Sequence, residues 1–160
     1  KCEVVLDKGF GMANGIAKGH DGRFYVANTD NGEINVLEIT SEGKVVQVDL
    51  IRTGIPLDNI SVDEQGNLIA AGFPKPLQVP KAIENAREIV APGVVLKIER
   101  KLGKRKSWEQ EYVVSKLVED GLAEKLPTPS IAVRDGSTER LFISGVASPF
   151  ITVCKKRNEE

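Results

Sequence analysis

Small polar side chains stand at three corresponding places along the chain, each at the start of an apolar, strand-like run. They are Asn14, the pair Asp58 and Asn59, and Ser130. Carboxylate and amide oxygens are the ligands that a hard cation such as calcium takes, in a shell of about 6–8 oxygens. Asn and Asp are also common where strands begin, because their side chains form turns. The residue types leave both interpretations open, and the repetition of the position favours a metal site.

The scarcity of histidine and cysteine excludes several other kinds of site. The chain has one histidine, His20, and two cysteines, Cys2 and Cys154. A structural zinc site takes four such ligands, so we expect none. His20 lies in a His-Asp-Gly turn, and no Gly-x-Ser-x-Gly elbow is present, so we name no catalytic side chain. Whether the two cysteines pair, stay free or bond elsewhere is open.

The polar residues must be positioned by strands, and the strand pattern recurs. Residues 14–27 match residues 58–71 at a constant offset of 44, and residues 130–144 repeat the pattern with a longer hairpin. A period of about 40–50 residues is typical of the four-stranded blade of a β-propeller. Because the first strands of successive blades line a central channel, we expect the polar residues to converge near its axis. The sequence therefore predicts an all-β fold of about three propeller blades.

The individual elements follow from local patterns. Short alternating or β-branched runs, separated by Gly-containing turns, predict further strands at Glu3–Leu6, Arg23–Ala27, Glu33–Ile39, Lys44–Leu50, Ile60–Val62, Leu68–Ala71, Val94–Glu99, Tyr112–Val114, Ile131–Val133, Leu141–Ser144 and Ile151–Cys154. Apolar residues recur at three and four positions over Val79–Val90, which predicts a short amphipathic helix. A second, weaker helical segment is expected over Lys116–Lys125.

The composition limits the classes of partner. The 160 residues are 41% hydrophobic and 28% charged, with a formal net charge of −1. Such a chain is too apolar for disorder and contains no run of about 18 apolar residues, so we predict no membrane span. Its near-zero net charge produces no general electrostatic field that would attract nucleic acid. One basic run is best interpreted as a solvated hairpin, with phosphate or membrane contact as the alternative; it comprises Lys97, Arg100, Lys101, Lys104, Arg105 and Lys106.

Three motifs resemble the C-terminal half of the paraoxonase/arylesterase family. They are Ala-Asn-Gly-Ile at residues 13–16, Leu-Asp-Asn-Ile-Ser-Val-Asp at residues 57–63, and Leu-Phe-Ile-Ser-Gly at residues 141–145, followed by Cys154. The resemblance implies a six-bladed propeller, related to the strictosidine synthase and gluconolactonase-like propellers, that hydrolyses lactones and aryl esters with calcium at its axis. It further implies that Asn14, Asp58 and Asn59 bind the catalytic calcium. The animal members of the family are secreted or lumenal, and the sequence leaves the compartment of this protein open.

The chain also departs from the family. Members carry catalytic histidines in earlier blades, and their His-Pro after the second repeat is Phe73-Pro74 here. By the same resemblance, Phe73 would line an apolar, substrate-binding wall. Cys154 corresponds to the family's C-terminal cysteine, whose disulfide partner lies near the N-terminus, whereas Cys2 corresponds to a position in mid-chain. A Cys2–Cys154 bond would therefore not be the family's disulfide.

We accordingly expect residues 1–155 to be the C-terminal blades of a longer, calcium-dependent arylesterase or lactonase, with residues 156–160 as a charged tail. Such a piece would lack the catalytic histidines, so the alternative is a catalytically inactive propeller or binding scaffold. The expected ligand is a small-molecule ester or lactone. Open blade edges would also permit self-association.

Overall fold

A computed structural model of the protein describes residues 1–86, 88–101 and 111–155. These residues form three antiparallel sheets. The first sheet contains β1 (Ala13–Lys18), β2 (Phe24–Asn28), β3 (Glu33–Ile39) and β4 (Val45–Arg52). The second contains β5 (Leu57–Val62), β6 (Leu68–Gly72), β7 (Gly93–Arg100) and β8 (Tyr112–Asp120), and the third contains β9 (Pro129–Asp135), β10 (Arg140–Gly145) and β11 (Thr152–Lys155).

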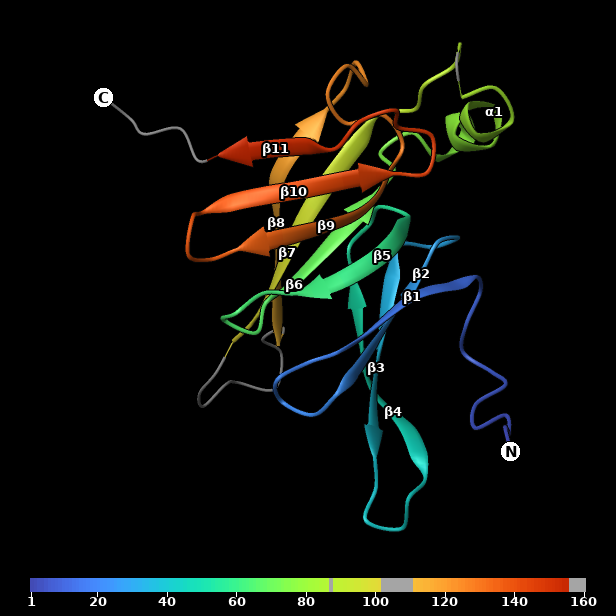
Figure 1. Ribbon diagram of the computed structural model, residues 1–160. Helices are drawn as coiled ribbons and strands as arrows, with labels where there is room; N and C mark the ends of the chain where they lie inside the picture. The colour runs from blue at the N-terminus through green and yellow to red at the C-terminus, as the bar shows by residue number, and fades with distance from the viewer. Residues whose placement is uncertain (87, 102–110, 156–160) are drawn as a thin grey trace.

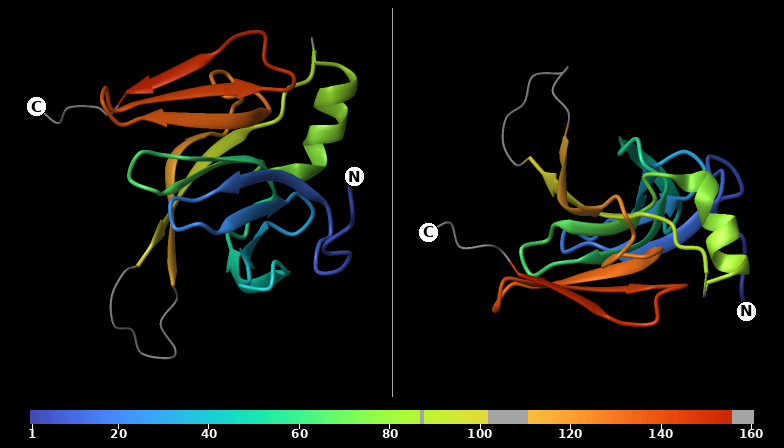
Figure 2. Two further views of the ribbon diagram at one scale, coloured as in Figure 1. Left: turned by 60° about the horizontal axis from the view of Figure 1, so that its bottom comes forward. Right: turned by 90° about the horizontal axis from the view of Figure 1, so that it is seen from above.

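The three sheets are repeated units. In each sheet the strands follow one another in chain order, so each unit is a meander that starts with β1, β5 or β9. These first strands lie side by side, with β5 between β1 and β9, and all start on the side of the molecule that carries α1 (Val79–Glu84) (Figure 1). Figure 2 shows the sheets stacked one over the next. The prediction of an all-β fold with blade-like units is confirmed.

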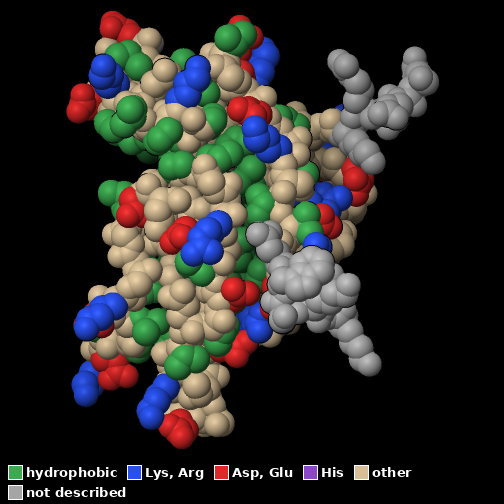
Figure 3. All heavy atoms as spheres, turned by 180° about the vertical axis from the view of Figure 1, so that it is seen from behind, with side chains coloured by type: hydrophobic (Ala, Val, Ile, Leu, Met, Phe, Trp, Pro, Cys, Tyr) green, Lys and Arg blue, Asp and Glu red, His purple; other side chains and the backbone are tan. Residues whose placement is uncertain are grey.

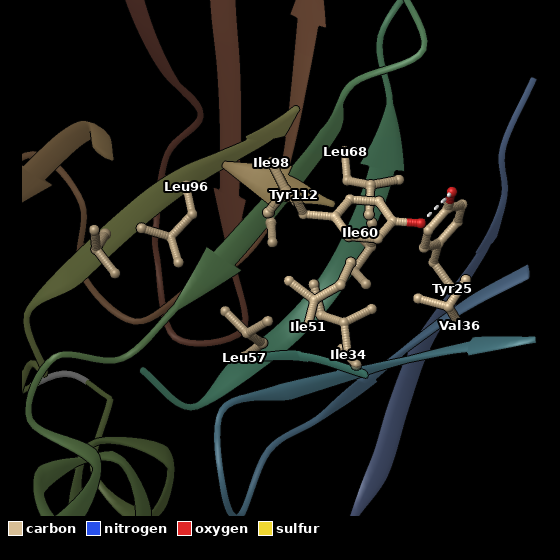
Figure 4. Close-up of a cluster of buried hydrophobic side chains, with 13 residues drawn as sticks. Tyr25, Ile34, Val36, Ile51, Leu57, Ile60, Leu68, Leu96, Ile98 and Tyr112 are labelled. Carbon is tan, nitrogen blue, oxygen red and sulfur yellow. Dashed lines mark hydrogen bonds between the residues drawn. The ribbon is translucent and has the colours of Figure 1, made fainter. Parts of the chain in front are cut away.

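Two hydrophobic cores hold neighbouring sheets together. The larger core lies between the first and second sheets, where Ile34 and Ile51 of the first sheet lie beside Leu57 of the second (Figure 4). Alternate residues of β6 serve different cores, as strand geometry requires: Leu68 and Ala70 belong to this core, whereas Ile69 belongs to the second. The smaller core lies between the second and third sheets; it comprises Ile69, Val95, Leu126, Ala132, Leu141 and Ile143.

A buried ion pair ties the second sheet to the third at the far ends of β5 and β9. The Asp63 side chain is 0% exposed, and its Oδ2 lies 3.1 Å from Arg134 Nη1. The same carboxylate accepts hydrogen bonds from the backbone of Gln65 and Asn67 and from the Asn67 side chain. Burial alone would raise the pKa of Asp63, but these hydrogen bonds and the one from Arg134 outweigh it and lower the pKa.

Two predicted elements are wrong, and one is too long. Residues 3–6 form no strand, because no described strand pairs with them. Residues 116–120 are not helical but extend β8, where Lys116 pairs with Leu96 and Asp120 with Gly93. Pairing along a whole neighbouring strand overrides the local helical pattern there. The helix predicted over Val79–Val90 is confined to α1 and is preceded by a 3₁₀ turn, η1 (Pro76–Gln78).

Some predictions concern residues that the structure does not describe. The predicted charged tail at residues 156–160 lies outside the described residues, as do Lys104, Arg105 and Lys106 of the basic run. Within the described part of the chain, no helix has the length and apolar character needed to cross a membrane.

Candidate functional site

A β-bulge interrupts the start of the first strand in every sheet. Asn14 and Gly15 together lie opposite a single residue of β2, and Asp58 and Asn59 lie opposite a single residue of β6. In the third sheet the pairing shifts at Ser130. Bulges turn side chains away from the regular alternation of a strand and are common beside functional sites. The three bulges thus present the small polar residues of all three sheets at one end of the inner strands.

A glycine lets the first two inner strands approach closely at this point. A Cβ atom added to Gly15 would lie 2.5 Å from Asn59 Cα and 2.9 Å from the Asp58 carbonyl oxygen. No side chain fits at that distance without movement of the backbone. Gly15 therefore brings Asn14 next to the Asp58–Asn59 pair.

Substituting this glycine should weaken the site. We expect Gly15→Ala to separate β1 from β5 and to lower the free energy of unfolding by about 1–3 kcal/mol, the usual cost of overpacking. Urea denaturation measures this effect. Gly121→Ala is the matched control, because nothing lies within 4 Å of an added Cβ there. Equal stability losses in the two variants would contradict the close approach of the inner strands.

Hydrogen bonds connect the polar residues of the three sheets. The Asn59 amide nitrogen donates to Asp58 Oδ1 at 3.0 Å and to Ser130 Oγ at 3.0 Å, and it also donates to the Ser130 carbonyl oxygen at 3.2 Å. The Asn14 amide nitrogen donates to Thr29 Oγ1 at 3.1 Å. Because both amides donate through nitrogen, their oxygens remain available as ligands or acceptors.

The carboxylate of Asp58 is the one fully charged group of this network. It is half-buried, and burial raises its pKa above 3.8, although hydrogen bonding from Ser130 and Asn14 acts in the opposite direction. Without a bound cation, the negative charge of Asp58 is thus incompletely compensated by its surroundings. A cation placed beside it would remove this penalty.

A large apolar cavity opens over the polar residues. Its volume is about 910 Å³, and Asn14, Asp58 and Ser130 lie along its lining together with Phe73. The remaining wall is mostly apolar and comes largely from η1 and α1; it includes Pro76, Leu77, Val79, Pro80 and Ile83, with Met12 and Val146 from other segments. Figure 3 shows hydrophobic side chains gathered at the end of the molecule where α1 lies, at upper left. Polar groups beneath an apolar wall are typical of a small-molecule site.

The structure brings most of the predicted site residues together. Asn14, Asp58 and Phe73 share the cavity, whereas Asn59 contacts Asp58 and Ser130 without lining the cavity. His20 lines a different cavity, with residues of the β5–β6 turn, at the opposite ends of the inner strands. The chain's one histidine therefore has no contact with the site.

Sequence reasoning missed several contributors. Thr29 and Asp30 follow β2 and line the cavity, and α1 supplies much of the apolar wall. No sequence pattern marked Asp30; its place beside Gly11, where an added Cβ would overlap the Asp30 carboxylate, is set by the fold. The sequence indicated the helix but not that it would cover the polar residues.

The donor set suits an oxygen-seeking cation better than a soft metal. One carboxylate and two amide oxygens come together at Asp58, Asn59 and Asn14, with the Ser130 hydroxyl beside them. Within the described residues, no cluster of three or more His, Cys, Asp or Glu side chains could hold a metal. A calcium ion fits oxygen donors of this kind, and water would have to complete its shell.

Comparison with known proteins gives two matches. A family model described as Arylesterase matches residues 3–121. Serum paraoxonase/lactonase 3 of Homo sapiens is 32% identical to this chain over 77 residues. That match covers 47% of this chain and 22% of the human protein, so the chain covers less than a quarter of its relative's length.

Proposed function

Because the chain belongs to the arylesterase family, we propose that it carries the calcium-binding part of a site that hydrolyses small carboxylic esters or lactones. The observation that carries this proposal is the convergence of Asn14, Asp58 and Asn59 from two bulged inner strands beneath a largely apolar cavity. Their oxygen donors match the preference of calcium.

Different residues of the chain would bind the metal, position its ligands and bind the substrate. Asp58, Asn59 and Asn14 would hold the calcium ion, and Ser130 and Thr29 would orient their side chains through hydrogen bonds. When bound, calcium supplies a positive charge that polarises an ester carbonyl and stabilises the developing oxyanion. The apolar wall, including Phe73, would receive the hydrocarbon part of the substrate and exclude water from it.

A second function is favoured by the position of His20. Hydrolysis needs a group that activates water, and the chain's one imidazole lies at the opposite end of the inner strands. The chain on its own would then be a calcium-binding scaffold that captures esters without turning them over. Open sheet edges, such as that of β11, would permit self-association of either form.

One set of measurements tests both functions. We expect isothermal titration of the metal-free chain with calcium chloride to show saturable binding. Hydrolysis of phenyl acetate and a δ-lactone, assayed in EDTA and after calcium is restored, then distinguishes a hydrolase from a scaffold. Binding without turnover would establish the scaffold and refute the hydrolase for this chain. Absence of calcium binding would overturn the site itself.

A further inference from the structure

Another cavity, separate from the candidate calcium site and from the cavity lined by His20, lies at the interface between the second and third sheets. Its volume is about 320 Å³, and its walls come from β7 and β8 on one side and from β9, β10 and β11 on the other. Four cationic side chains line it, Lys97, Arg134, Arg140 and Lys155, against a single acid, Glu139. Leu117, Val118 and Leu141 provide an apolar surface between them.

Two of the four cations are already neutralised. Arg134 lies between Asp63, at 3.1 Å, and Glu139, at 2.8 Å. Lys97 Nζ lies 2.9 Å from Glu99. The remaining cations of the cavity are Arg140 and Lys155.

Arg140 and Lys155 have no such compensation from the residues that the structure describes. Among the described residues, neither has an acidic oxygen within 4.0 Å. Asp135 is the register partner of Arg140 in β9, but its carboxylate accepts hydrogen bonds from Ser137 and Thr138 instead. Arg140 is also paired directly with Lys155 across β10 and β11. Like charges directly opposite each other destabilise a sheet, so this pair carries a cost that a bound anion would remove.

From this excess charge and the adjoining apolar surface, we infer that the cavity binds a small organic anion, a phosphate or carboxylate attached to a hydrocarbon group. The anionic head would lie between Arg140 and Lys155, since a guanidinium and an ammonium are the usual partners of such groups. The hydrocarbon part would cover Leu117, Val118 and Leu141. Because the cavity is built from two sheets, the ligand would stabilise their association.

Phenyl phosphate and benzoate are suitable probes, with binding measured by calorimetry and by the shift in melting temperature. We expect saturable binding to the native chain and at least tenfold weaker binding to the double variant Arg140→Gln/Lys155→Gln. The double variant Lys8→Gln/Arg52→Gln makes the same change in charge elsewhere and should bind like the native chain. In the absence of probe, removing the opposed charges should leave the melting temperature unchanged or raise it.

The affinities of the two double variants test whether the cavity binds the anion specifically. Equal losses of affinity in both double variants would show general electrostatic attraction and overturn the inference, as would no binding to the native chain. Tighter binding of phenyl phosphate than of inorganic phosphate would support use of the apolar surface, and equal binding would refute it. Should the Arg140→Gln/Lys155→Gln variant fail to fold by circular dichroism, Lys155→Gln alone provides the same comparison with Lys8→Gln.

Discussion

Replacing Asp63 by alanine should lower the free energy of unfolding by about 3–5 kcal/mol, the usual cost of removing one partner from a buried ion pair. The substitution removes a fully buried carboxylate that accepts hydrogen bonds from the turn after β5 and binds Arg134 of the next sheet. Arg134 would keep Glu139 as a partner but would lose its link to the second sheet. Urea unfolding at neutral pH measures the loss.

The pH dependence separates this effect from simple loss of packing. Because the folded-state pKa of Asp63 lies below 3.8, its contribution is fully present above pH 3.8 and is lost as the pH falls through the lowered pKa. The stability difference between the native chain and Asp63→Ala should therefore narrow in acid. Asp7→Ala, at an exposed carboxylate, is the control and should change stability little. A difference that stays constant down to strongly acidic pH would refute the role of the charge.

The substitution Asp58→Asn should have opposite effects on stability without and with calcium. Burial raises the pKa of Asp58, so its charge costs stability at neutral pH, and the cost disappears as the pH falls below 3.8. The metal-free variant should therefore be more stable than the native chain at pH 7. Thermal and urea unfolding in EDTA measure this gain.

Calcium should reverse the order of stability. If the proposed site is correct, calcium at 100 times its dissociation constant would stabilise the native chain by about 2.7 kcal/mol. We expect Asp58→Asn to weaken calcium binding at least tenfold, about 1.4 kcal/mol of binding free energy, and so to lose at least about half of this stabilisation. Asp7→Asn makes the same charge change away from the site and should respond like the native chain. An undiminished calcium response in Asp58→Asn would remove Asp58 from the ligand set.

The repeat was the strongest signal in the sequence, because two copies of one supersecondary unit at a fixed offset define both strands and turns. It predicted that Asn14 and Asp58 would meet. The local alternating pattern correctly placed β3 at Glu33–Ile39. Local patterns gave wrong predictions where the secondary structure of a segment depends on pairing with a neighbouring strand. Residues 3–6 have a β-rich composition but no partner, whereas Lys116–Asp120 extends a strand because β7 is long enough to pair with it.

The site was predictable in its residue types but not in its geometry. A bulge is a shift in pairing between two strands, and neither strand records it alone, so the turning of Asp58 and Asn59 could not be anticipated. The apolar wall comes from η1 and α1, whose position over the inner strands depends on tertiary packing. A composition pattern on Val79–Val90 indicated a helix without indicating what it covers.

Because the interior is divided into two cores, we expect the sheets to unfold separately. The first and third sheets share no core, so each is stabilised through the second, as in a linear array with nearest-neighbour coupling. Stability is then not uniform along the chain, and the third sheet has the smaller core and the fewest strands. Amide hydrogen exchange should report its opening as a separate, low-energy event, with β1–β8 still folded. The seam between the second and third sheets is therefore the place where a ligand could most readily change the population of open states.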